Sequence, residues 1–364
     1  MKYVITVALL LAQVTLAYAQ YPGDNGNPVP DEDGPTIRVI KLESSIPVHQ
    51  FAMPVKNIEV IAIADDSTNL GISRNRYRAI NTVSVPDKPL QEYLQGYISK
   101  KYGDQYQQNK GQYLLCLVQL LRINDHRSAP ERSYVRIKGA TFLSPDNQQF
   151  QLSCQFDTTL VDADKHASRD HSWNMARAID MFMTAADKQK VSGTPHSRQE
   201  IMKIAWERYQ QPIYTANHYT DGVYMSYREF LKNAPAVNNF TIKMERNKAI
   251  VYHIHDDSSR NVIPDPWGIC YKGQLFRCKW NNFIPLKRHG LAFDIADRDT
   301  IVYLKVTGGQ IVDAAAAGGL LGVLLLKAKD QTDGRENYFV TYQQDLLDRP
   351  YAGMIDPFTG ELMF

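Results

Sequence analysis

Residues 113–123 read YLLCLVQLLRI, and this run is apolar at both odd and even positions. Side chains of a strand point alternately to opposite faces of a sheet, so the run predicts a strand that is covered on both faces. Two further strands are predicted at 134–142 and 149–160, joined by a turn at Ser144-Pro145-Asp146-Asn147. Apolar and polar residues alternate in the second of these, which is typical of a strand with one wet face.

Two helices are predicted to cover this sheet. The first begins near Asp87 and the second near His171, and each carries one apolar stripe at the spacing of a helix. The stripe residues are Pro89, Leu90, Tyr93, Leu94, Tyr97 and Ile98 in the first, and Met175, Ala178, Ile179, Phe182 and Met183 in the second. With a strand from residue 58, they predict an N-terminal α/β sandwich domain over 36–190, a mixed sheet covered by two helices.

The polar stretch 188–196 contains Gly193 and Pro195 and predicts a domain boundary. Beyond it, capping boxes at Ser197 and Ser226 open short helices. Short strands then follow at 240–244, 249–255, 267–271, 275–280, 291–295, 301–306 and 338–342. The expected fold class is therefore α+β, with a β-rich domain with short helices over 197–364.

Length and net charge limit the expected number of domains and the expected class of partner. The 364 residues predict two domains, and 41 Lys and Arg against 39 Asp and Glu leave a net charge of +2. No charged block is long enough to create a surface field of one sign, which disfavours nucleic acid as a partner.

The N-terminus predicts export. Lys2 precedes a short apolar run, and Ala17-Tyr18-Ala19 forms an A-x-A cleavage site, so residues 1–19 are interpreted as a signal peptide. Residues 20–35 are rich in Pro, Gly and acids and predict a flexible leader. The expected location is the periplasm, the outer-membrane periphery or the cell surface.

Four cysteines enter the oxidising compartment that export implies, namely Cys116, Cys154, Cys270 and Cys278. Cys116 and Cys154 are expected in neighbouring strands, either as a bridge or as buried free thiols. Cys270 and Cys278 flank a hairpin turn and form a bridge only if the register places them opposite each other.

Residues 314–326 are uncharged, apolar and glycine-rich, and are too few to span a bilayer as a helix. We expect this segment to be buried within the second domain. The alternative is self-association or insertion at a membrane surface, with Gly318 and Gly322 allowing close approach of two helices.

The metal candidate is the string Tyr252-His253-Ile254-His255-Asp256-Asp257. On a strand His253 and His255 share a face, and Asp257 is a third candidate ligand, so a metal-dependent hydrolase is one hypothesis. The alternative is a pair of surface histidines at a strand end.

A second polar cluster is interpreted as a loop that caps a helix. Its members are Asp162, Asp164, His166, Asp170 and His171.

No nucleophile elbow, Walker A loop or dinucleotide fingerprint occurs in the sequence, and no cofactor is expected. Trp206, Trp267 and Trp280 are interpreted as core and cross-strand residues in preference to the lining of a ligand groove.

Residues 221–237, DGVYMSYREFLKNAPAV, resemble the GxYxSYxEFxxNxP segment of uncharacterised secreted proteins of the Bacteroidota. Trp267-Gly268 to Gly273 resembles their WGxxxG hairpin, and the turn at 356–361 is also similar. The resemblance covers about residues 200–364 and implies an envelope protein with no established activity. The N-terminal domain weakly resembles accessory proteins of the outer membrane.

These observations favour an exported interaction or assembly module of the cell envelope without catalytic activity. Its expected partner is an envelope protein or outer-membrane component. The alternative is the metal-dependent hydrolase using His253, His255 and Asp257.

Overall fold

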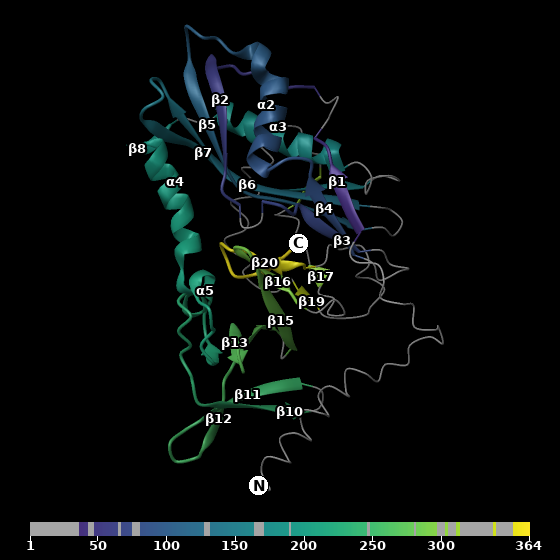
Figure 1. The fold of residues 1–364 in the computed structure, drawn as a ribbon, viewed down its shortest axis with the longest axis vertical. Helices are drawn as coiled ribbons and strands as arrows, with labels where there is room; N and C mark the ends of the chain where they lie inside the picture. Colours follow the sequence, from purple (N-terminus) through teal and green to yellow (C-terminus); the bar gives the residue numbers. More distant parts are fainter. Residues whose placement is uncertain are drawn as a thin grey trace, which may run out of the picture. The chain divides into compact units, whose positions relative to one another are not determined.

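The structure is a computed structural model (Figure 1). It describes residues 36–42, 47–64, 67–74, 81–126, 132–163, 171–188, 191–245, 248–279, 282–296, 303–304, 311–313, 338–339 and 352–364. The predicted signal peptide and leader, 1–35, and the apolar segment 314–326 lie outside these ranges. Residues Ile37–Phe364 group into one unit by their contacts, and their division into two domains stays a prediction.

The elements of the first half are β1 (Thr36–Ile40), β2 (Val55–Ala62), β3 (Gly71–Arg74), β4 (Asn81–Pro86), α2 (Leu90–Tyr102), η1 (Gly103–Gln105), β5 (Gln112–His126), β6 (Arg132–Ser144), β7 (Phe150–Ala163), α3 (His171–Lys188) and β8 (Ser192–His196). The second half begins with α4 (Arg198–Glu207), η3 (Arg208–Gln210), α5 (Pro212–Thr215), β9 (Gly222–Tyr224), α6 (Tyr227–Leu231), β10 (Phe240–Glu245), β11 (Lys248–Ile254) and β12 (Arg260–Val262). It continues with β13 (Gly268–Tyr271), β14 (Gln274–Lys279), β15 (Asn282–His289), β16 (Ala292–Ile295), β17 (Tyr303–Leu304), β18 (Ile311–Asp313), β19 (Tyr338–Phe339), β20 (Met354–Ile355) and β21 (Leu362–Met363).

The first sheet confirms the predicted mixed architecture. Its strands are ordered β18-β7-β6-β5-β2, with β8 paired to β7. The pairs β5–β6 and β6–β7 are antiparallel, whereas β2 runs parallel to β5. Part of the polar stretch expected as a boundary, residues 192–196, is the strand β8.

The strand β5 is covered on both faces, as its sequence predicts. Leu114 and Cys116 pack in one core with buried residues of α2 and α3. Leu115 and Leu117 pack on the other face with Ile201 of α4. A third helix, which lies beyond the expected boundary, therefore completes the covering of the first sheet.

The start of α4 is fixed by its capping box. Ser197 accepts a hydrogen bond from the backbone N–H of Glu200, and the Glu200 carboxylate accepts one from the Ser197 N–H at 2.7 Å. These two bonds satisfy donors that the first turn of a helix leaves open. At the start of α6 the Ser226 hydroxyl accepts from the Glu229 N–H, which confirms the predicted cap, but the Glu229 carboxylate accepts from the Met225 N–H in place of the Ser226 N–H that a full capping box requires.

The second large sheet is ordered β21-β20-β16-β15-β14-β13-β9. Its β13–β14 hairpin turns at Lys272 and Gly273, whose φ values of 54° and 77° fit the type I′ turn that matches strand twist. The sequence analysis missed β15, since Pro285 and the polar run of Lys287, Arg288 and His289 obscure its alternation. β10, β11 and β12 form a separate three-stranded sheet.

The three strings of the Bacteroidota resemblance meet in this region. The Trp267 indole donates to the Gly360 carbonyl at 3.1 Å, and the Tyr227 hydroxyl donates to the Pro357 carbonyl at 3.1 Å. Gly360 has a φ of +72°, and a Cβ there would lie 2.3 Å from the Tyr227 ring. Glycine is therefore required where the turn contacts this aromatic cluster.

Arg136 of β6 ties the same turn to the first sheet. Its guanidinium lies 2.9 Å from Asp356 and 3.1 Å from Asp157 of β7. Burial raises the pKa of Asp157, but Arg136 and Lys138 outweigh it and hold that pKa below the ordinary value. Asp157 is therefore a charged partner of the largely buried Arg136 guanidinium, and Asp356 is the second carboxylate in contact with it.

The structure favours the second alternative for the cysteines, buried free thiols, and shows that Cys116 and Cys154 are not in neighbouring strands. All four are buried free thiols, so neither candidate bridge is formed. Cys116 pairs with Thr141, which pairs with Cys154, so a whole strand separates the two cysteines. Two strand spacings are about 9.5 Å, beyond the reach of a disulfide. In the hairpin, Cys270 lies opposite Leu275, not Cys278.

We expect Arg136→Met to lower the free energy of unfolding by about 3 kcal/mol, because Asp356 is left as a buried charge without its cation. Chemical denaturation measures the loss. The matched control is Arg198→Met, whose pair with Glu59 is more than a third exposed on the arginine side. It should cost less than about 1 kcal/mol. Equal effects of the two substitutions would contradict a special role for Arg136.

We expect all four thiols to resist alkylation by iodoacetamide at pH 8 in the folded protein. Burial raises the pKa of Cys270 and of Cys278 to about 12, and the thiolate is the reacting form. Intact-mass measurement should show no adduct natively and four adducts in denaturant. A disulfide between Cys116 and Cys154 would contradict the strand register. Rapid labelling of the native protein would contradict the burial of the thiols.

Candidate functional site

The predicted metal-binding pair lies on β11 and just beyond it. The rings of His253 and His255 face each other with centroids 4.2 Å apart, as expected for side chains on one face. Asn261 of β12 contacts the His255 ring at 3.0 Å, and Asp257 accepts from the Ser259 N–H at 2.9 Å in a tight turn. Across the described ranges, no group of three or more His, Cys, Asp or Glu side chains is placed to hold a metal ion.

The second polar cluster of the sequence analysis is only partly described, because Asp164, His166 and Asp170 lie outside the described ranges. Asp162 lies on β7 opposite Ser133 of β6. His171 is the first residue of α3 and is fully buried. The interpretation of this cluster as a loop therefore does not extend to His171.

His171 belongs to a buried polar group that sequence reasoning did not anticipate. Its Nδ1 lies 2.8 Å from the Ser133 hydroxyl, and its Nε2 lies 3.6 Å from a carboxylate oxygen of Asp125. Asn174, one turn further along α3, donates to both the hydroxyl and the backbone carbonyl of Ser133 at 3.2 Å. The hydroxyl thus accepts from Asn174 and is free to donate to Nδ1.

This order of hydroxyl, imidazole and carboxylate is that of a nucleophilic triad. The four side chains are, however, between 0% and 1% exposed, so no substrate reaches the hydroxyl in this conformation. What the arrangement does is attach the first turn of α3 to the ends of β5 and β6. We interpret it as a buried anchor of the helix.

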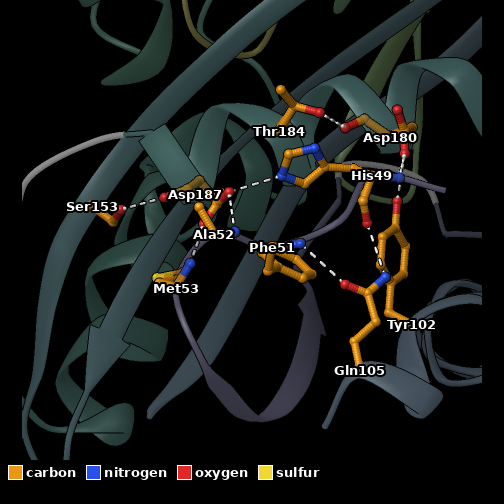
Figure 2. Close-up of polar contacts among 11 residues, drawn as sticks. His49, Phe51, Ala52, Met53, Tyr102, Gln105, Ser153, Asp180, Thr184 and Asp187 are labelled. Atoms are coloured by element: carbon orange, nitrogen blue, oxygen red, sulfur yellow. Dashed lines mark hydrogen bonds and ion pairs between the residues drawn. The ribbon is translucent and has the colours of Figure 1, made fainter.

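Another polar cluster, around His49, attaches residues 49–53 to the C-terminal half of α3 (Figure 2). The His49 ring donates to Asp187 at 3.0 Å, and the same carboxylate accepts from the N–H groups of Ala52 and Met53. About two turns before Asp187 in α3, Asp180 accepts from the His49 N–H at 2.8 Å and from the Tyr102 hydroxyl at 3.0 Å.

The same segment is also held by the short helix η1 that follows α2. The Gln105 carboxamide bonds both the Phe51 N–H and the His49 carbonyl. Burial, and then the charge of Asp180, raise the pKa of Tyr102, which keeps its hydroxyl a donor. Because both carboxylates are occupied by backbone donors, this cluster acts as a clamp on residues 49–53.

A surface of different character lies on the sheet of β10, β11 and β12. One face of this sheet is packed inward, with Val251 buried against Ile269 and Val223. Register places the alternate residues on the other face, which we call the outer face. Its members include the apolar residues Ile250, Tyr252, Ile254 and Val262 and the polar residues Thr241, Lys243 and Arg260.

The outer face combines one exposed apolar side chain, Val262, and three half-buried ones with two cations. Val262 is 55% exposed, which is high for a valine in a strand. The Lys243 ammonium lies 5.5 Å from the centre of the Tyr252 ring, so a cation and an aromatic ring share one patch. The sequence predicted the strands β10 and β11 but missed β12. The surface is complete only when β12 pairs with β11.

Comparison with known proteins adds little. No family model matches the chain, and no curated protein matches it. A crystal structure from Xanthomonas campestris, described by the family model DUF330, has 9% identity and a TM-score of 0.27, covering 42% of this chain and 96% of that one. A second, of an uncharacterised protein, has 14% identity and a TM-score of 0.22, covering 40% and 99%. Neither likeness is strong enough to support an argument about function.

A search of the described helices for one that is long and apolar enough to cross a membrane found none.

Metal analysis tests the hydrolase hypothesis on β11. Protein purified without a histidine tag should retain less than about a tenth of an equivalent of zinc or iron, because two imidazoles alone bind weakly. His253→Ala serves as the control and should leave the metal content unchanged. Near-stoichiometric metal that this substitution removes would instead establish the metal site.

Proposed function

We propose that this chain is an exported interaction or assembly module of the cell envelope that works by binding and not by catalysis. The signal-peptide pattern of residues 1–19 supports export. The polar clusters around His49 and His171 support the absence of chemistry at those places, since their groups hold backbone segments and helix ends together. The resemblance of residues 200–364 to secreted Bacteroidota proteins points the same way.

The outer face of the β10–β11–β12 sheet carries the proposal. Exposed apolar patches that adjoin polar groups are typical of protein interaction sites. Tyrosine and arginine are enriched at such interfaces because each combines a large contact area with a hydrogen-bonding end. The outer face presents Tyr252 and Arg260 together with aliphatic side chains, so it offers both kinds of contact.

The charges of this face define the partner's chemistry. Lys243 and Arg260 are exposed and lie at opposite sides of the apolar residues. Ion pairs at the rim of an interface steer association and set its register. We therefore propose that the partner is an envelope protein whose apolar contact surface is bordered by Asp or Glu.

Site-specific photo-crosslinking in the native host tests this function. A photoreactive residue at Val262 should give one discrete protein adduct in the envelope fraction. The matched control position is Gln199, an exposed residue of α4 outside the outer face. The adduct should disappear when Tyr252→Glu is added, because a buried carboxylate opposes an acidic, apolar partner.

Two results would overturn the proposal. One is the same adducts at Val262 and at Gln199, which would show nonspecific capture. The other is an adduct at Val262 that persists undiminished with Tyr252→Glu and with Arg260→Glu, which would show that the face does not select its partner.

A further inference from the structure

Phe358, in the turn at 356–361, contacts two cations from distant parts of the chain. The central carbon of the Arg208 guanidinium lies 3.4 Å from the centre of the Phe358 ring, and the Lys138 ammonium lies 3.9 Å from the same centre. Arg208 belongs to η3 and Lys138 to β6. The two positive charges are therefore at most 7.3 Å apart, which is the sum of the two distances.

The Arg208 guanidinium is held flat and keeps its hydrogen-bond donors unused. A separation of 3.4 Å is that of two stacked planar groups, so the N–H groups point outward in the guanidinium plane, parallel to the ring. Within the described part of the chain these donors have no hydrogen-bond or ion-pair partner. The side-chain nitrogens of Arg208 are nevertheless absent from the set of buried polar atoms without a partner, so solvent reaches them.

The charges beside this ring do not balance. Lys138 lies 2.9 Å from the Asp157 carboxylate, which Arg136 also contacts at 3.1 Å. Arg136 in turn lies 2.9 Å from Asp356. With Arg208 the group holds three cations and two carboxylates, a formal net charge of +1. Burial lowers the pKa of Arg208 more than the neighbouring Asp356 and the nearby tyrosines raise it. One more negative charge would therefore stabilise this group.

We propose that Arg208 and Lys138 form a binding site for a small oxyanion, either a carboxylate or a phosphate group. The planar fork of an arginine matches two oxygens of either group, and a lysine adds a point charge without a fixed direction. The two cations are close enough for one such group to interact with both of them.

The ring beneath the arginine is positioned before any ligand binds. The Asp356 carboxylate accepts a hydrogen bond from the Phe358 N–H at 2.7 Å, and Arg136 holds that carboxylate from β6. The arginine fork is therefore set in place by the turn, which lowers the cost of ordering it around a ligand. This site shares no residue with the outer face, so it does not depend on the proposed function.

Isothermal titration calorimetry tests the proposal, with sodium phosphate and sodium acetate each compared with sodium chloride at equal ionic strength. At least one of the two oxyanions should bind saturably at one site per chain, with a dissociation constant of about 1 mM or lower. Arg208→Gln should weaken this binding at least about tenfold, because it removes the charged fork. Lys138→Gln should weaken it about two- to fivefold, as expected for a partly exposed ion pair.

The matched control is Arg228→Gln in α6, an exposed arginine that should leave the binding unchanged. Saturable binding of phosphate alone identifies the ligand as a phosphate group, and saturable binding of acetate alone identifies it as a carboxylate. Heats for both oxyanions that equal those for chloride would overturn the proposal. So would equal binding by the Arg208→Gln and Arg228→Gln variants.

A measurement on the unaltered protein covers the case in which Arg208→Gln does not fold. Phenylglyoxal modifies accessible arginine side chains, and mass spectrometry of the peptides reports the rate at each arginine. Phosphate or acetate should slow the modification of Arg208 relative to chloride and leave that of Arg228 unchanged. No protection of Arg208, or equal protection of both arginines, would overturn the proposal.

Discussion

The burial of β5 on both faces is the constraint on which the rest of this structure depends. A strand with apolar side chains on each side must be covered twice, or it exposes one whole row of them to water. Here α2 and α3 cover one face and α4 covers the other. Because α4 follows the polar stretch 188–196, the second half of the chain is required to complete the core of the first.

The extent to which sequence predicts this fold differs between elements for identifiable reasons. Residues 113–123, α2 and α3 follow from periodicity, since their apolar residues recur at the spacing of one secondary structure. The strands β12, β20 and β21 have only two or three residues each, too few for any period to show. The expectation that Cys116 and Cys154 lie in neighbouring strands was wrong because it depended on the order of strands, which places β6 between them.

The candidate sites show the same division. The shared face of His253 and His255 follows from their spacing of two along a strand, and the structure brings their rings together. The partners of His171 and His49 lie on other elements, 38 residues away at Ser133 and 138 away at Asp187, and no local pattern announces them.

The contact of Arg136 with the turn at 356–361 has a consequence for how the chain matures. The Arg136 guanidinium also reaches Met363, 227 residues later in the sequence. If the chain crosses a membrane from its N-terminus, the first sheet, in which Asp157 already pairs with Arg136, emerges well before the segment that brings the second carboxylate, Asp356, to the same guanidinium. Contacts between such distant residues form late and slowly. The first sheet would then remain loosely packed during transit, in a state that favours binding by chaperones until the rest of the chain follows.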